Sequence, residues 1–297
     1  MSHPNNNVLI NGNPLQRMSP SLTVESSAPI VARFSLIYLG VRTRNDLTAL
    51  RNLVPLARRL NPGIKFFGYA SLGGSVNFQA WTALVDQWLI DLPSIDGIFI
   101  DDFGDRYYNA AGKPWVTRAE QNAALDYCHQ THQLAAWVNN YDLGQLFAVL
   151  AANDPHAQYS EPIHLGTTAF TDYVLLEGYY TWSRDLPVDA NTPPNFEGRA
   201  HRLGRLWLAH ALQTPNLQFV LDVGASSLAT YPQSDWDAVW TQAQAAGINF
   251  VALTAFDQRA PNAYFLTNQR GQLPADNAAS SLNTETAASP ENEGEAE

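Results

Sequence analysis

The amino-acid sequence predicts an α/β fold, a single (β/α)8 barrel of the TIM type. Short apolar runs alternate with amphipathic stretches along the 297 residues, and this alternation is typical of parallel strands joined by crossover helices. Most runs are apolar at nearly every position, as expected of strands that are covered on both faces. The length suits one barrel, because such barrels often exceed about 200 residues as one domain.

Seven apolar runs are the candidate strands. They cover residues 32–40, 64–72, 96–101, 134–140, 172–180, 217–224 and 249–256. A closed eight-stranded barrel needs one more strand, and three segments could supply it: NVLIN near residue 8, PIHLG near residue 163 and YFLTN near residue 264. Without an eighth strand, an open doubly wound sheet is the alternative.

Helices are predicted between these runs. Apolar residues recur with a helical period over residues 47–60, and the NPG that follows is a strong stop signal. Thr117 with Glu120, and Ser234 with Asp237, have the spacing of capping boxes, in which each side chain bonds the backbone of the other residue. Both pairs therefore mark predicted helix starts.

The composition divides the chain into three regions. Residues 1–28 are rich in Asn, Ser and Pro, and residues 271–297 are polar and acidic, so neither end can bury enough apolar surface to order itself. We expect a flexible N-terminal arm, a barrel domain over residues 29–270, and a disordered acidic tail. Residues 181–194 are predicted to form a long loop after the fifth strand, on the face where barrels build their sites.

The charge distribution argues against nucleic acid as a partner. The formal net charge is −11, and residues 276–297 carry six acids and no base. Neither the tail nor the rest of the chain shows a basic patch, and Lys65 and Lys113 are the only lysines. Phosphate binding needs a basic surface that releases counterions. No apolar run has the roughly 18 residues of a membrane span, and the first residues lack a signal-peptide pattern. We expect a cytoplasmic, non-classically exported or particle-associated protein.

Cysteine and histidine usage predicts no metal and no cofactor. Cys128 is the only cysteine, which excludes an internal disulfide, and its place in an apolar helical run predicts a buried thiol. The seven histidines show no HExxH spacing, and His129 with His132 falls near a predicted helix end, where the helix dipole favours them. There is no Gly-rich phosphate loop and no GxSxG elbow.

Acidic residues at the ends of two predicted strands are the candidate catalytic groups. Asp101 and Asp102 end one strand, and Glu177 lies near the end of another. Hydrolysis of a glycosidic bond needs two carboxyl groups, a proton donor and a base or nucleophile, whose environments set different pKa values. The alternative is structural, because such acids often cap helices or pair with a loop arginine such as Arg106 or Arg184.

Other side chains at predicted strand ends could line the same bowl and bind a sugar. Aromatic rings can stack on the apolar faces of pyranose rings, and polar groups can bond the hydroxyls. Tyr69 and Trp137 could equally be core aromatics, and Asp222 could equally cap a helix. The candidate substrate-binding residues are Tyr69, Trp137, Asn139, Tyr179, Tyr180, Trp182 and Asp222.

Several short motifs together resemble one family. They are GYASLGG at 68–74, W-x6-W at 81–88, DGIFIDDFG at 96–104, VNN at 138–140, DYVLLEGYY at 172–180 and AAGINFVALTAF at 245–256. Their order and spacing are similar to those of the spherulin-like and endo-alpha-1,4-polygalactosaminidase group of TIM-barrel glycoside hydrolases. The resemblance implies a (β/α)8 barrel with Asp101 and Glu177 at the positions of that family's strand-end carboxylates. Asp102 stands where that family often has Glu.

Two functions therefore follow from the sequence. The first is a glycoside hydrolase-like barrel that acts on a polysaccharide or oligosaccharide. The second is a non-catalytic carbohydrate-binding or surface-recognition barrel, a component of a phage particle or another assembly, with the polar termini as attachment arms to its partners. An aldolase or isomerase is disfavoured, because neither Lys65 nor Lys113 stands in a persuasive Schiff-base position and no phosphate loop is evident.

Overall fold

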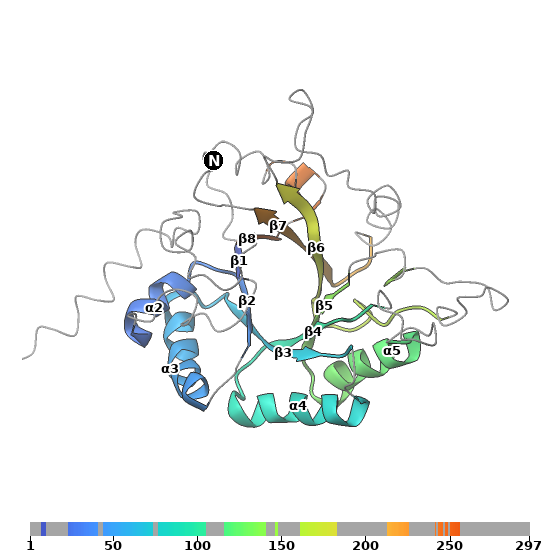
Figure 1. The fold of residues 1–297 in the computed structure, drawn as a ribbon, viewed down its shortest axis with the longest axis horizontal. Coiled ribbons are helices and arrows are strands. Elements are labelled where there is room, and N and C mark those ends of the chain that lie inside the picture. The colour runs from blue at the N-terminus through green and yellow to red at the C-terminus, as the bar shows by residue number, and fades with distance from the viewer. Residues whose placement is uncertain are drawn as a thin grey trace, which may run out of the picture.

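Eight parallel strands form the centre of the molecule in the computed structural model (Figure 1). They pair in sequence order, and β1 also pairs with β8, which closes the sheet. The strands are β1 (Asn7–Leu9), β2 (Leu36–Leu39), β3 (Lys65–Ser71), β4 (Gly97–Asp101), β5 (Ala135–Asn139), β6 (Asp172–Trp182), β7 (Leu217–Ala225) and β8 (Phe250–Ala255). The structure describes residues 7–9, 23–40, 44–73, 77–104, 116–140, 146–147, 161–182, 213–225, 241, 243–245, 247–248 and 250–255.

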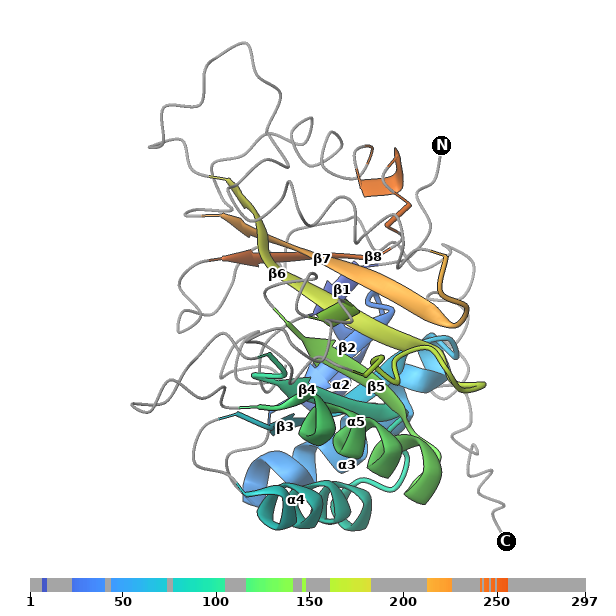
Figure 2. The ribbon, with the colours of Figure 1, turned by 90° about the vertical axis from the view of Figure 1, so that its right-hand side faces the viewer.

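Helices cover the outside of the first half of the sheet (Figures 1 and 2). They are α2 (Val24–Val31), α3 (Arg44–Leu60), α4 (Phe78–Asp91) and α5 (Arg118–Asp126), which continues into the π-helical turn η1 (Tyr127–Thr131). The predicted alternation of strand and helix is confirmed from β1 to α5. The helices expected between the later strands fall mostly outside the described residues, so the complete (β/α)8 pattern stays a prediction there.

Each of the seven predicted strands overlaps an observed strand, and the eighth is β1. Val8 and Leu9 pair with Leu36 and Ile37 of β2, so the NVLIN segment supplies it. The PIHLG segment contains no strand, and the YFLTN segment lies outside the described residues. β1 and the first turn of α2 lie within residues 1–28, where composition alone indicates a flexible arm. Backbone pairing on both sides of β1 gives order that its polar flanks do not reveal.

Local signals place the helix ends where the sequence predicts them. Thr117 Oγ1 accepts a hydrogen bond from Glu120 N at 3.3 Å, and Glu120 Oε2 accepts one from Thr117 N at 2.7 Å. After α3, Asn61 Nδ2 donates to Ala32 O at 2.9 Å, which joins the end of α3 to the end of α2. The capping box predicted at Ser234 lies outside the described residues, as does the predicted loop beyond residue 182.

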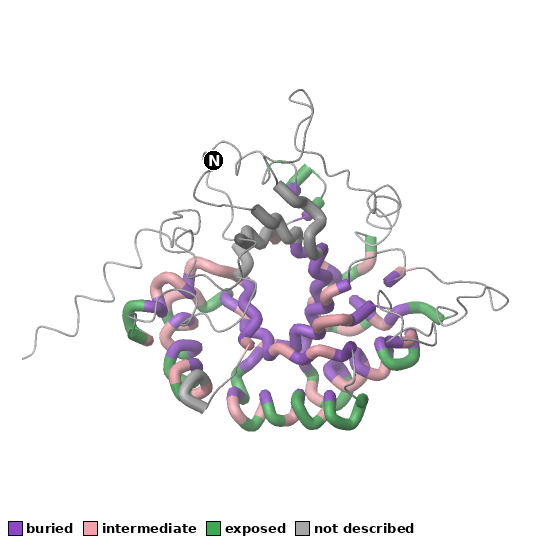
Figure 3. Tube along the Cα trace, in the orientation of Figure 1, coloured by how far each residue is buried: buried purple, intermediate pink, exposed green. Residues whose placement is uncertain are grey.

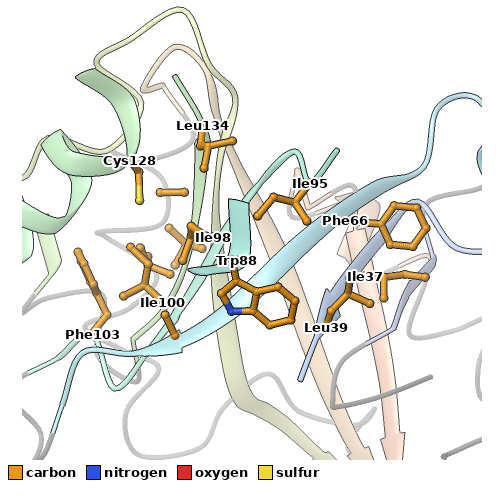
Figure 4. Close-up of a cluster of buried hydrophobic side chains, with 14 of the residues drawn as sticks. Ile37, Leu39, Phe66, Trp88, Ile95, Ile98, Ile100, Phe103, Cys128 and Leu134 are labelled. Atoms are coloured by element: carbon orange, nitrogen blue, oxygen red, sulfur yellow. The ribbon is translucent and has the colours of Figure 1, made fainter. Parts of the chain in front are cut away.

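Side chains on the two faces of the strands form two cores. Most residues of β2 to β5 are buried (Figure 3). The inner core fills the barrel and is largely aromatic: Phe99 stacks on Tyr38 at 4.1 Å between ring centroids, and Trp137 meets Phe99 edge-on at 5.0 Å. The outer core lies between strands and helices and is mainly aliphatic (Figure 4). Its members include Ile37, Leu39, Ile98, Ile100, Val138 and Val174.

A close approach of α4 to β3 depends on glycine. A Cβ atom on Gly68 would lie 2.6 Å from the ring of Trp88, which is too near for any side chain. Trp88 is part of the outer core (Figure 4), and its Nε1 donates to Tyr69 O at 2.8 Å. The indole thus fixes the backbone of β3 at the residue that carries Tyr69.

One polar stripe along α5 and η1 holds the segment that leads into β6. Asn122 Nδ2 donates to Pro162 O at 2.9 Å, and Asn122 Oδ1 accepts from His164 N at 3.0 Å. One turn further on, Asp126 Oδ1 lies 3.0 Å from His164 Nδ1. The spacing of these helix residues puts them on one face, so α5 sets the position of the chain just before β6.

The stripe ends at a fully buried pair, His129 and Asp172. His129 Nε2 lies 2.9 Å from Asp172 Oδ1, and the two side chains are 1% and 0% exposed. Ala136 N donates to the same carboxylate oxygen at 2.9 Å, and Gly166 N donates to the other at 2.9 Å. Three nitrogen atoms thus surround a carboxylate that water does not reach. His129 does lie near a helix end, as the sequence predicts, but its partner is this aspartate.

Cys128 is buried, as the sequence predicts. Burial raises the pKa of its thiol strongly, and the nearby charge of Asp172 adds to the rise, so the reactive thiolate is scarce. We expect the folded protein to react with a thiol reagent such as Ellman's reagent only as fast as it opens or unfolds. A time course with and without denaturant measures this, and rapid reaction of the native chain would contradict the buried position.

None of the helices in the described ranges is long and apolar enough to cross a membrane.

Candidate active site

The carboxyl ends of β3, β4 and β5 bring three predicted site residues together. Ser71 at the end of β3 pairs with Asp101 at the end of β4, and Ile100 pairs with Val138, one residue before Asn139. Alternate residues of a strand share a face. Tyr69 therefore points to the same side as the inner core residue Phe67, and Asp101 to the same side as Phe99. The carboxyl ends of barrel strands are the edge where TIM-barrel enzymes place their sites.

Asp101 accepts three hydrogen bonds from described residues. Tyr69 Oη donates to its Oδ2 at 2.8 Å. Asn139 Nδ2 donates to its Oδ1 at 2.9 Å, and the backbone N–H of Asp102 donates to the same oxygen at 2.9 Å. The carboxylate is only partly buried. Asp101, Tyr69 and Asn139 thus form one preorganised group, supplied by three neighbouring strands.

Asp102 has different partners and a different backbone conformation. Its Oδ2 accepts a hydrogen bond from Ser71 Oγ at 2.8 Å. Its φ of 51° lies in the left-handed region, which is uncommon for residues other than glycine. Burial raises the pKa of the Asp102 carboxyl, the Ser71 hydrogen bond lowers it, and the charge of Asp101 raises it further.

Backbone contacts fix the three strand ends relative to one another. Leu72 N donates to Asp101 O at 2.9 Å, and Phe103 N donates to Asn139 O at 3.1 Å. Gln121 of α5, which is fully buried, donates from Nε2 to Phe103 O. No motif in the sequence marks Gln121, because a buried glutamine on a helix gives no signal until the position of Phe103 is known.

Trp137 lies below this group, in the inner core. Its side chain is fully buried and contacts Phe67 and Phe99 edge-on, at 5.4 and 5.0 Å between ring centroids. Of the two roles that the sequence allows for Trp137, a core aromatic and a sugar-binding residue, its burial fits the core aromatic. The side chain of Trp137 supports the floor of the site and is not available to stack on a sugar.

The other predicted site residues are described only through their backbone. Glu177, Tyr179, Tyr180 and Trp182 belong to β6, and Asp222 belongs to β7; their side chains lie outside the described residues. The pairing of β6 with β7 shifts register between Leu176 and Tyr180, a stretch that includes Glu177. Irregularities of this kind occur often next to active sites, where they re-aim a side chain. Arg106 and Arg184 also lie outside the described residues.

Lys65 is at the opposite end of the barrel from Asp101. It begins β3 and donates from Nζ to Tyr173 Oη at 3.1 Å. Burial raises the pKa of the Tyr173 phenol, while the neighbouring ammonium of Lys65 lowers it. Lys65 therefore does not belong to the group at the carboxyl ends of the strands. Within the described part of the chain, no three His, Cys, Asp or Glu side chains are grouped so as to hold a metal ion.

Comparison with known proteins identifies no family. No family model and no curated protein match the chain. Among solved structures, the GH99 endo-alpha-mannosidase from Bacteroides thetaiotaomicron has a TM-score of 0.47 and 10% identity, covering 88% of this chain and 87% of that chain. A GH5-4 broad specificity endoglucanase from Clostridium longisporum has a TM-score of 0.46 and 10% identity, covering 84% and 86%.

A third structure shows how widely such likenesses range. 2,3-dimethylmalate lyase, a member of the PEP mutase/isocitrate lyase superfamily, has a TM-score of 0.39 and 14% identity, covering 78% of this chain and 73% of that chain. At these identities and TM-scores, the likenesses establish neither a family nor an activity. The resemblance of the short motifs to the spherulin-like and endo-alpha-1,4-polygalactosaminidase group stays a prediction.

Proposed function

We propose that this protein is a glycoside hydrolase that cleaves a polysaccharide or oligosaccharide with Asp101 and Glu177. The observation that supports the proposal most is the position and bonding of Asp101. It ends an apolar barrel strand, and the side chains of two neighbouring strands hold its carboxylate in place. Catalytic carboxylates need this kind of rigid support, because small displacements lower the rate sharply.

The hydrogen bonds suggest how the two acids divide the reaction. Among the described residues, Tyr69, Asn139 and the backbone of Asp102 donate to Asp101, and a nucleophile or base in glycoside hydrolysis acts through carboxylate oxygens held in place. We assign Asp101 as the nucleophile or base, and Glu177 on β6 as the proton donor to the leaving oxygen. Tyr69 and Asn139 are positioning residues for Asp101. The aromatic side chains at 179, 180 and 182, together with Asp222, are the proposed substrate-binding residues.

One observation favours the second function, a carbohydrate-binding barrel without turnover. Both carboxylate oxygens of Asp101 already have partners within the chain, as in a group whose role is to join strands. In that case the bowl would bind a glycan through aromatic and polar contacts, and the acidic tail from residue 271 would attach the barrel to an assembly. For both functions, the proposed barrel domain ends near residue 270 but begins before residue 29, because β1 (Asn7–Leu9) pairs with β2 and β8.

A panel of amino-sugar and neutral polysaccharides separates the two functions. We expect the wild-type chain to release reducing ends from at least one member, measured by a reducing-end assay, and to bind that member in a pull-down assay. Binding without release would favour the recognition barrel. If the chain neither binds nor cleaves any member of the panel, both proposed functions are wrong.

A further inference from the structure

Asp102 lies where three strand ends meet, although only its neighbour Asp101 reaches the group with Tyr69 and Asn139. Its carboxylate is bonded to Ser71 of β3 at 2.8 Å, its backbone N–H to Asp101 of β4 at 2.9 Å, and the next residue, Phe103, donates its N–H to Asn139 O of β5 at 3.1 Å. The residue is therefore a junction between the elements that carry the site.

The backbone of Asp102 must take the left-handed conformation for these contacts to form. At φ 51° the chain turns sharply directly after β4. In this region the Cβ atom of a residue clashes with the backbone. Asn and Asp adopt the conformation more readily than most residues, and glycine, which has no Cβ atom, adopts it freely. A conformation of this kind persists only where the surrounding contacts impose it.

The loop after β3 is shaped to fit Asp102. A Cβ atom on Gly73 would lie 2.4 Å from the Cβ of Asp102, so only glycine allows the two segments to touch. Leu72, between Ser71 and Gly73, donates its N–H to Asp101 O at 2.9 Å. Residues 71–73 thus contact both acids, through the side chain of one and the backbone of the other.

We propose, on the basis of the function proposed above, that Asp102 is a positioning residue which holds Asp101 through its left-handed backbone and its hydrogen bond to Ser71. It does not exchange a proton with the substrate. This assignment replaces the catalytic role that the sequence alone suggests for Asp102. Among the described residues, the charge that acts on its carboxyl is that of Asp101, and the side chain that donates to it is Ser71.

Four variants test the proposal by their pattern: Asp102→Asn, Asp102→Gly, Asp102→Ala and Ser71→Ala. Asparagine keeps an acceptor for Ser71 and tolerates the left-handed backbone but cannot exchange a proton, so we expect kcat/KM within about tenfold of wild type. Glycine keeps only the backbone conformation and should retain more activity than alanine, which keeps neither. If Asp102→Asn loses as much activity as Asp101→Asn, the proposal is wrong.

A titration decides the question even if no substrate is found. The Asp102 carboxyl carbon is followed by NMR against pH in the wild type, Asp101→Asn and Ser71→Ala. Removal of the Asp101 charge should lower the pKa of Asp102, and removal of the Ser71 donor should raise it, because these two contacts act in opposite directions. The side-chain amide of Asn139 should shift in Asp102→Ala and return close to its wild-type position in Asp102→Asn.

The two failures can be told apart. In one outcome, the wild-type chain is inactive while Asp102 titrates as described and the Asn139 amide shifts in Asp102→Ala but not in Asp102→Asn. That result would support the positioning role of Asp102 and contradict only the proposed hydrolase activity. If the pKa of Asp102 is unchanged in both Asp101→Asn and Ser71→Ala, or if the Asn139 amide signal has the same chemical shift in all variants, the positioning role is wrong, whatever the activity. If the alanine variant does not fold, Asp102→Gly and Ser71→Ala carry the comparison.

Discussion

Replacement of Asp172 by alanine is expected to destabilise the protein strongly. The substitution leaves the N–H groups of Ala136 and Gly166 and the imidazole of His129 buried without their acceptor. Removal of one member of a buried charged or hydrogen-bonded group typically costs about 3–5 kcal/mol. Urea unfolding followed by circular dichroism measures the loss.

Asp126→Ala is the matched control. Asp126 also pairs with a histidine, at 3.0 Å to His164, but the two side chains are 38% and 41% exposed. Exposed ion pairs contribute about 0–1 kcal/mol, so this variant should unfold almost like the wild type. Equal losses in the two variants would mean that burial of the Asp172 group is not what stabilises the start of β6.

Asp101→Asn is expected to abolish most of the hydrolytic activity without unfolding the protein. Asparagine has nearly the same shape and can still accept from Tyr69 or Asp102, but it cannot act as a nucleophile or base. Loss of such a group lowers the rate by about 10²–10⁴-fold. Initial rates of reducing-end release and the midpoint of thermal unfolding, measured on the same preparations, give both quantities.

Two further variants serve as comparisons for the activity of Asp101→Asn. Asp91→Asn removes a carboxylate on α4 that is bonded to Arg51 at 3.0 Å, away from the strand ends, and should keep full activity. Tyr69→Phe removes one of the three donors to Asp101 and should have an intermediate effect, chiefly on kcat, because the hydrogen bond acts through Asp101. A fully active Asp101→Asn variant would remove Asp101 from the proposed mechanism.

Strands β2 to β8 could be predicted from the sequence because each overlaps a short apolar run that is followed by polar residues. The same logic placed Asp101, since a strand-end acid needs no knowledge of the rest of the chain. β1 could be named only as one of three candidates. Its three residues carry no periodicity, and its order comes from pairing with β2 and β8, which are distant in sequence.

Side-chain partners could not be predicted in the same way. Trp137 and Asn139 lie two residues apart on the same face of β5. Trp137 is fully buried below the site, whereas Asn139, one layer further along the barrel, bonds Asp101. Asp102 follows Asp101 directly, but the left-handed turn sends its carboxylate to Ser71. These distinctions depend on the stagger of neighbouring strands, which no single segment contains.

The most direct test of the central claim, that Asp101 and Glu177 act together on one glycosidic bond, compares Glu177→Gln and the double variant with Asp101→Asn on the substrate that the wild type cleaves fastest. Groups that act as a unit are strongly non-additive. We therefore expect each single variant to lose nearly as much kcat/KM as the double variant. Wild-type activity in Glu177→Gln, or losses that multiply in the double variant, would contradict a shared reaction.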